Sequence, residues 1–212
     1  MKELRCDKCG IFACKAAPGT EEYPDSCPMR VEQDLLFEAE GAYLDDEQLH
    51  RYTLAAARTE AGGYCVEPRV EEIMSFAGRL DAKRLGVASC IGLMRESHIL
   101  CRILTANQFE VRCVGCKVGS IDKEKIGIKD EEKIRPGQYE SMCNPIGQAM
   151  LLNDAGTELN IAVGLCVGHD SIFFKHSEAP VTVLIAKDRV TGHNPAAALY
   201  TAHSYYRRLK NE

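Results

Sequence analysis

The sequence predicts an α/β fold in which an open, mostly parallel sheet of about four strands carries helices on both faces. From residue 83 onward, short apolar runs alternate with helical patterns, as in successive strand-helix units. The apolar runs show little polar alternation, which is typical of strands buried on both faces of a parallel sheet. Because crossover connections are right-handed, the simplest order for four such strands is 2-1-3-4.

Composition and charge limit the possible partners. The chain has 212 residues, of which 45% are hydrophobic and 27% charged, and its formal net charge is −5. These values describe a folded protein whose charge favours neither nucleic acid nor an anionic membrane as a partner. No apolar run approaches the roughly 20 residues of a membrane span, and the N-terminus lacks the apolar core of a signal peptide. We therefore expect a cytoplasmic protein.

Cysteine is the unusual component of this composition. The chain contains 11 cysteines, an odd number that excludes complete pairing within one chain. In a reducing compartment such thiols are typical of metal or iron–sulfur ligands, or of reactive groups. Clusters of cysteines along the chain are therefore candidate metal-binding or reactive sites.

Residues 1–30 are expected to form a Cys-rich metal-binding module. Four cysteines follow the pattern C-x2-C-x4-C-x12-C and are followed by a proline: Cys6, Cys9, Cys14 and Cys27. A C-x2-C turn lets two thiolates reach one metal, and two further thiolates complete a set that suits zinc or a [4Fe–4S] cluster. The spacing does not decide between these two.

Residues 31–80 are expected to form a helical segment, a hairpin packed on the main domain. Acidic residues at positions 45–47 favour a helix start, and good helix formers follow from Leu49 to Ala61. Gly62 and Gly63 interrupt this pattern, and helical spacing resumes at Val70.

Residues 81–212 are expected to form the α/β domain. The expected strands are residues 84–89, 109–114, 159–163 and 181–186. Asn144 and Pro145 are typical of a helix N-cap and its first position, which predicts a helix over residues 146–153. A last helix is expected to begin after Pro195 and to continue through Tyr200 to Leu209.

Chemically active side chains follow the end of every expected strand. Because parallel strands end at one edge of the sheet, these side chains should meet at the carboxyl edge, where open α/β sheets bind ligands. The set comprises Cys90, Cys116, Cys143, Cys166, His169, Lys187 and Asp188. Thiols and an imidazole at one edge would suit a second cluster or metal ion.

Individual roles can be assigned to this set. Cys90 at the start of a helix could be a nucleophile, because the positive end of the helix dipole lowers a thiol pKa. Lys187 could bind a small anionic substrate, while Asp170 or Asp188 could orient an imidazole or move protons. His193 follows the fourth strand and could face the same edge, where Cys116 and Cys143 could bind a cofactor.

Several motifs together resemble a known family. They are the N-terminal C-x2-C-G-x3-C module, Cys143-Asn144-Pro145-Ile146, the turn 164–170, and residues 187–195. Across nearly the whole chain they resemble a Cys-rich family of archaea and bacteria, domain of unknown function 1847. The resemblance implies a cytoplasmic metal-binding protein and assigns no reaction.

Three functional hypotheses remain open from the sequence. The first is a redox or metalloprotein with a structural zinc or electron-relay cluster at its N-terminus and a reactive Cys/His centre at the sheet edge, served by a redox partner. The second is a metal carrier or sensor without catalysis. The third is a thiol enzyme that uses Cys90 and no metal in the sheet.

Overall fold

The computed structural model describes residues 4–19 and 22–210. The chain divides into two compact units, Met1–Arg58 and Thr59–Glu212. The division expected from sequence, with boundaries after residues 30 and 80, stays a prediction.

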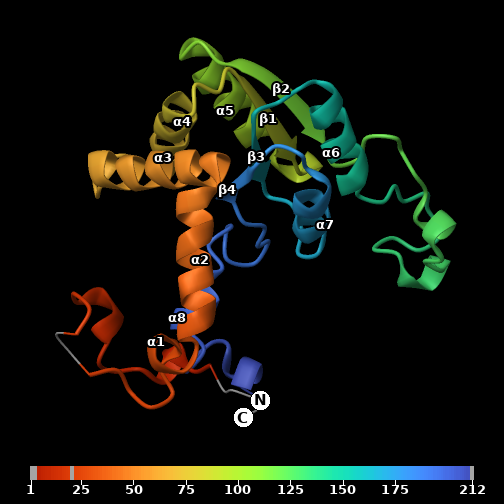
Figure 1. Cartoon of the computed structure of the whole chain (residues 1–212). Helices are drawn as coiled ribbons and strands as arrows, with labels where there is room; N and C mark the ends of the chain where they lie inside the picture. Colours follow the sequence, from red (N-terminus) through yellow and green to blue (C-terminus); the bar gives the residue numbers. More distant parts are fainter. Residues whose placement is uncertain (1–3, 20–21, 211–212) are drawn as a thin grey trace. The chain divides into compact units, whose positions relative to one another are not determined.

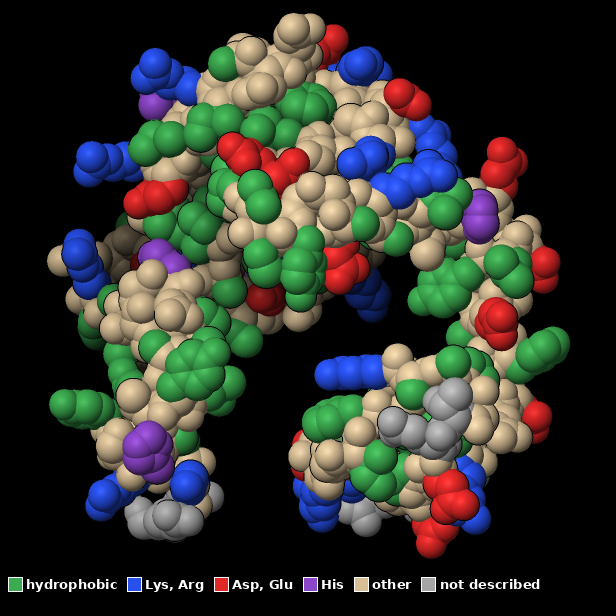
Figure 2. Space-filling model, turned by 90° about the vertical axis from the view of Figure 1, so that its left-hand side faces the viewer, with side chains coloured by type: hydrophobic (Ala, Val, Ile, Leu, Met, Phe, Trp, Pro, Cys, Tyr) green, Lys and Arg blue, Asp and Glu red, His purple; other side chains and the backbone are tan. Residues whose placement is uncertain are grey.

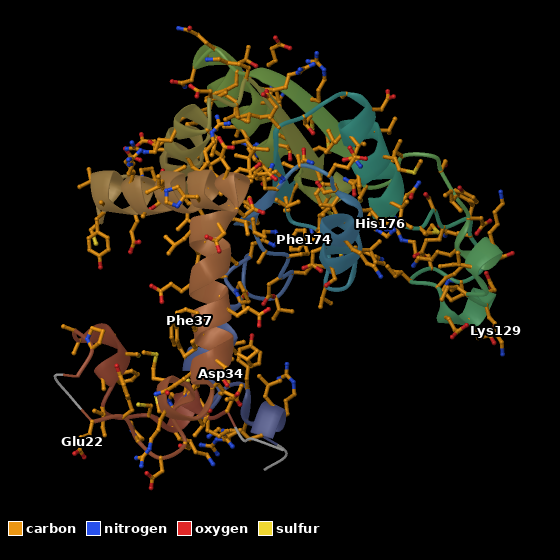
Figure 3. The ribbon with its side chains drawn as sticks, in the orientation of Figure 1. Glu22, Asp34, Phe37, Lys129, Phe174 and His176 are labelled. Atoms are coloured by element: carbon orange, nitrogen blue, oxygen red, sulfur yellow. The ribbon has the colours of Figure 1, made fainter. Side chains whose placement is uncertain are left out.

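The first unit contains little buried surface. It holds two 3-10 turns, α1 (Pro28–Val31), α2 (Gln33–Asp45) and the start of α3 (Glu47–Gly63). No residue of α2 is buried, and Phe37 projects from this helix with 78% of its surface exposed (Figure 3).

The second unit is built on a parallel sheet of four strands (Figure 1). The strands are β1 (Arg84–Ser89), β2 (Glu110–Gly115), β3 (Leu159–Val163) and β4 (Val181–Ile185). Their order is β2-β1-β3-β4, and every neighbouring pair is parallel. The predicted fold class and strand order are therefore confirmed.

Helices lie on both faces of this sheet. The helices of the unit are α4 (Arg69–Arg79), α5 (Met94–Ala106), α6 (Pro145–Asp154), α7 (His169–His176) and α8 (Ala196–Tyr200). Ser89 meets Ser97 of α5, whereas its neighbour Ala88 packs with Leu152 of α6 and Phe173 of α7. Adjacent strand residues point to opposite faces, so α5 covers one face while α6 and α7 cover the other.

The prediction of a long last helix was wrong. Helix α8 ends at Tyr200, and the chain continues in turns before a 3-10 helix at Arg207–Lys210. The Thr201 hydroxyl donates to the Ala197 carbonyl, and Leu199 and Tyr200 are largely exposed. A short helix without a packed apolar face has little to stabilise it, since most helical stability comes from tertiary contacts.

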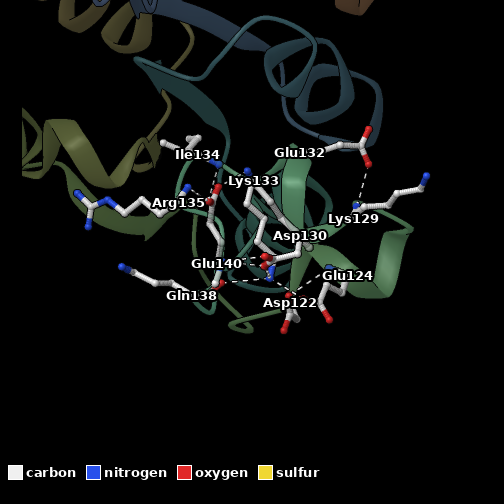
Figure 4. Close-up of polar contacts among 12 residues, drawn as sticks. Asp122, Glu124, Lys129, Asp130, Glu132, Lys133, Ile134, Arg135, Gln138 and Glu140 are labelled. Atoms are coloured by element: carbon white, nitrogen blue, oxygen red, sulfur yellow. Dashed lines mark hydrogen bonds and ion pairs between the residues drawn. The ribbon is translucent and has the colours of Figure 1, made fainter.

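The segment between β2 and α6, residues 117–142, is held together by ion pairs rather than by an apolar core (Figure 4). The Lys133 side chain is 3% exposed, and its ammonium contacts the carboxylates of Glu124 and Asp130. These carboxylates raise the pKa of Lys133. Glu140 pairs with Lys123 and also accepts a hydrogen bond from the Ile134 N–H. The result is an ordered loop, called the 117–142 loop below.

The distribution of charged side chains over the surface is consistent with the formal net charge of −5. Figure 2 shows basic and acidic side chains interspersed over the visible face, with no continuous block of one sign. Among the helices that the structure describes, none is long and apolar enough to cross a membrane.

Candidate thiol site at the carboxyl edge of the sheet

Three cysteines meet where β1 and β2 end and α6 begins. Cys90 follows β1, Cys116 follows β2, and Cys143 lies two residues before α6. The Sγ atoms of Cys143 and Cys116 are 3.7 Å apart. On the other side of Cys116, the N–H of Ile91, the residue after Cys90, donates to the Cys116 sulfur at 3.3 Å. Cys116 is therefore the central member of a cluster of three thiols.

Main-chain hydrogen bonds hold this cluster to the sheet. The Cys90 N–H donates to the Val163 carbonyl at 2.9 Å, and the Cys116 N–H donates to the Ser89 carbonyl at 2.8 Å. The Asn144 N–H donates to the Cys116 carbonyl at 2.8 Å, which places the chain at Cys143 beside Cys116. The thiols thus approach one another because the parallel strands end in register.

A layer of fully buried polar side chains lies behind the thiols. Gln148 of α6 donates from Nε2 to the carbonyls of Ser89 (3.2 Å) and Val114 (2.7 Å), which bridges the ends of β1 and β2. The hydroxyl of Ser89 contacts that of Ser97 at 2.6 Å and the carbonyl of Cys90 at 3.0 Å. Buried polar groups that are nearly all satisfied specify one arrangement of the elements around them. We infer that this layer sets the spacing between Cys90 and Cys116.

The environment of Cys90 stabilises a thiolate. The pKa of Cys90 is lowered to about 5, first by the hydrogen bond from Cys116 and then by the Gly92 N–H and Lys187, against the opposing effect of burial. The Gly92 N–H and the Lys187 ammonium lie 3.4 Å and 3.3 Å from its sulfur. Cys90 precedes a 3-10 turn, Ile91–Leu93, instead of the predicted α-helix, so hydrogen bonds replace the expected helix dipole.

The pKa of Cys143 is lowered as well, and Cys143 is the more accessible of these two thiols. Its pKa is lowered to about 5, first by the hydrogen bond from Cys116 and then by the charges of Lys117 and His169. Cys116 lies between Cys90 and Cys143, and its interactions with both thiols, together with burial, raise its own pKa, while its single S–H can be donated to one of them at a time. Cys90 and Cys116 are buried, with 5% and 2% of their surfaces exposed, whereas Cys143 is partly exposed.

The loop after β4 supplies two cations to the site. Lys187 reaches Cys90, and Arg189 donates to the Cys166 sulfur at 3.1 Å. Asp188 turns inward to its own loop, where its carboxylate accepts from the N–H groups of Val190 and Thr191. Its main-chain N–H donates to Nδ1 of His193 at 3.1 Å. In the structure, Asp188 and His193 therefore shape the loop that carries the two cations.

The glycine turn after β3 lies at the same carboxyl edge of the sheet. Gly164 has φ +63°, and a Cβ there would lie 2.0 Å from Leu93. The turn carries Cys166 and leads into α7, whose first residue is His169. The buried Nδ1 of His169 has no hydrogen-bond partner in the described part of the chain. The Asp170 carboxylate accepts from the Ser171 N–H.

The structure thus brings together most side chains that the sequence placed at this edge, although their roles stay predictions. Sequence reasoning missed Arg189, Gln148 and Ser89. Arg189 lies in the same run as Lys187 after a strand, which is a signal that could have identified it. Gln148 and Ser89 are polar residues inside apolar patterns, and their pairing depends on tertiary contacts that no periodicity encodes.

Among residues 4–19 and 22–210, no three or more His, Cys, Asp or Glu side chains form a group that could hold a metal ion. The second metal ion or cluster expected at the sheet edge stays a prediction.

The N-terminal cysteines share one cavity. A pocket of about 260 Å³ is lined by Cys6, Cys9, Cys14 and Cys27. The Phe12 N–H donates to the Cys9 sulfur at 3.4 Å, and this bond is the main cause that lowers the pKa of Cys9. Hydrogen bonds from main-chain N–H groups to sulfur are typical of the surroundings of metal-bound thiolates. The four thiols line one pocket, although among the described residues their sulfurs are not gathered around one point.

Comparison with known proteins gives relatives without an assigned activity. A family model described as "Protein of unknown function (DUF1847)" matches residues 27–184. An uncharacterized protein of Methanocaldococcus jannaschii is 42% identical over 206 residues, which cover 97% of this chain and 98% of the relative. No solved structure matches the chain. The matched range contains all three thiols of the cluster.

Proposed function

The chain belongs to the DUF1847 family of proteins of unknown function, and we propose that it is a cytoplasmic cysteine-based redox protein that reduces disulfides at the sheet edge. The 3.7 Å separation between the sulfurs of Cys143 and Cys116 carries this proposal. One of these thiols is an accessible thiolate and the other a buried thiol that keeps its proton. A nucleophile beside a resolving thiol is the arrangement that thiol–disulfide exchange requires.

The proposed reaction proceeds in two displacements. The Cys143 thiolate attacks one sulfur of a substrate disulfide, the substrate S–S bond breaks, and its electron pair leaves on the second substrate sulfur. The Cys116 sulfur then attacks the Cys143 sulfur, its proton passes to the first leaving thiolate, and the remaining substrate sulfur leaves as a thiolate. The substrate gains two electrons, and the Cys116–Cys143 pair becomes a disulfide.

The sequence favoured Cys90 as the nucleophile, whereas burial favours Cys143. A disulfide substrate must approach the attacking sulfur, and only Cys143 of the three clustered thiols is partly exposed. The hydrogen bond from Cys116 and the nearby charges of Lys117 and His169 supply the stabilisation that a helix dipole would have given Cys90.

Trapping of the mixed disulfide tests this assignment. With oxidised glutathione as the probe, Cys116→Ser should accumulate a glutathione adduct on Cys143, because the resolving thiol is gone. The unaltered protein should instead pass to the internal Cys116–Cys143 disulfide without a stable adduct. Mass spectrometry of acid-quenched, alkylated peptides distinguishes the two.

Two controls make this test specific. Cys143→Ser should yield no adduct in the cluster, and Cys65→Ser should behave like the unaltered protein because Cys65 is an exposed thiol outside the cluster. The assignment is wrong if the unaltered protein also retains a stable adduct on Cys143, or if Cys65 reacts while Cys143 does not.

The shared N-terminal pocket supports a second candidate function, which is metal binding. In this proposal Cys6, Cys9, Cys14 and Cys27 provide four thiolates to zinc or a [4Fe–4S] cluster. Zinc would stabilise the module, whereas a cluster would supply one-electron transfer. The carrier or sensor hypothesis corresponds to reversible binding at the same four thiolates.

Metal content after anaerobic purification tests this second proposal. We expect one zinc ion per chain, or a visible iron–sulfur absorption that bleaches with reductant, and loss of either in Cys14→Ser. The matched control Cys65→Ser should retain it. A chain without bound metal, or with metal that survives both Cys14→Ser and Cys27→Ser, contradicts the proposal.

A further inference from the structure

Cys90 has no role in the two displacements proposed above, yet it is built into the same cluster. The neighbouring Cys116 thiol is the largest cause of its lowered pKa, and the Cys90 sulfur lies 3.3 Å from the Lys187 ammonium. The N–H of the next residue, Ile91, donates to the Cys116 sulfur at 3.3 Å. Cys116 therefore has a thiol neighbour on each side.

The two neighbours differ in access. Cys143 is partly exposed, whereas Cys90 is 5% exposed. A disulfide between Cys116 and Cys143, called the outer disulfide, lies where solutes can reach it. A disulfide between Cys90 and Cys116, called the inner disulfide, would be enclosed by the ends of the strands.

We infer, on the basis of the proposed function, that Cys90 is a third catalytic thiol that converts the outer disulfide into the inner one and so returns Cys143 to its free form. The Cys90 thiolate attacks the Cys116 sulfur, the Cys116–Cys143 bond breaks, and its electron pair leaves on Cys143 as a thiolate. Neither protons nor electrons are gained, so the step requires no further reagent. It frees the accessible thiolate while the oxidised pair stays protected.

Lys187 controls the balance between the two disulfides. In the outer form Cys90 remains a thiolate, and the Lys187 ammonium and the Gly92 N–H stabilise it. In the inner form that charge is lost from Cys90 and transferred to Cys143. The lysine therefore favours the outer disulfide, because charge-assisted hydrogen bonds are stronger than neutral ones.

Disulfide mapping after oxidation with one equivalent of oxidised glutathione tests this inference. We expect both disulfides in the unaltered protein, and a several-fold higher ratio of inner to outer disulfide in Lys187→Met. Lys187→Arg keeps the charge and should restore the original ratio. Lys83→Met removes an exposed cation just before the start of β1, at the opposite edge of the sheet, and it should leave the ratio unchanged.

The outcomes separate the two proposals. If the outer disulfide forms and the inner one is absent from both the unaltered protein and Lys187→Met, the role of Cys90 is overturned and the proposed function stands. If neither disulfide forms, the proposed function itself fails. Of the two disulfides, Cys90→Ser can form only the outer one. It therefore shows which disulfide-linked peptide in the mass spectrum belongs to the outer disulfide.

Discussion

Replacing Cys116 with alanine is expected to raise the pKa of Cys143 from about 5 and to slow its alkylation several-fold at pH 6. The hydrogen bond from Cys116 is the largest cause of the low pKa, so its removal leaves the charges of Lys117 and His169 against the opposing effects of burial and of Cys90. Below its pKa a thiol is protonated and unreactive. The loss of alkylation rate is therefore greatest at pH values between the pKa of Cys143 in the unaltered protein and its pKa in Cys116→Ala. Iodoacetamide labelling from pH 4 to 9, read by mass spectrometry, measures this shift.

The change in alkylation rate is limited because the intrinsic nucleophilicity of a thiolate falls with its pKa. A thiolate of lower pKa is a weaker nucleophile, with a Brønsted coefficient of about 0.4–0.5. At pH 6 a thiol of pKa about 5 should therefore react only roughly tenfold faster than a simple thiol of pKa about 8.5. Cys116→Ser retains a hydroxyl donor and should keep more of the shift than Cys116→Ala. An unchanged pH profile in Cys116→Ala would disprove the hydrogen-bonded cluster.

Replacing Gly86 with alanine is expected to destabilise the second unit by about 3–4 kcal/mol. A Cβ at this central position of β1 would lie 1.9 Å from Oδ1 of Asn160, whose side chain is fully buried. That oxygen accepts from the Thr157 hydroxyl, while the Asn160 amide donates to Ser177, each at 2.8 Å. The methyl group would thus both overpack the site and break a buried polar network.

Chemical denaturation of matched variants measures this loss. Gly78→Ala is the control, because a Cβ at this exposed position of α4 meets no atom within 4 Å. Alanine there should be neutral or slightly stabilising, since glycine costs up to about 1 kcal/mol in a helix. Equal stability of Gly86→Ala and Gly78→Ala would contradict the packing around Asn160.

The sheet and its reactive edge could be predicted because both follow from local pattern and topology. Apolar runs predicted β3 at Leu159–Val163 with the observed bounds. The parallel arrangement then places the residues after each strand at one edge, which explains why Cys90 and Cys116 meet. Asn144 also caps α6 as its sequence predicted, since its side chain accepts from the Gly147 N–H.

Other features depend on contacts that are distant in sequence. The ion pairs of the 117–142 loop join residues such as Lys123 and Glu140, and no periodic pattern encodes such pairs. The bridge from Gln148 to Ser89 and Val114 likewise requires the assembled sheet. The accessibility of Cys143 relative to Cys90, which changed the choice of nucleophile, depends on how α6 and the strand ends pack.

The most direct measurement is a redox titration of the unaltered protein in thiol–disulfide buffers, with differential alkylation of all 11 cysteines. We predict that Cys116 and its clustered partners lose free thiol together in one two-electron transition, with a change of about 30 mV for each tenfold change in the ratio of forms. Cys65 should stay reduced throughout. The account is contradicted if the clustered thiols stay reduced across the range, or if each of them is oxidised independently.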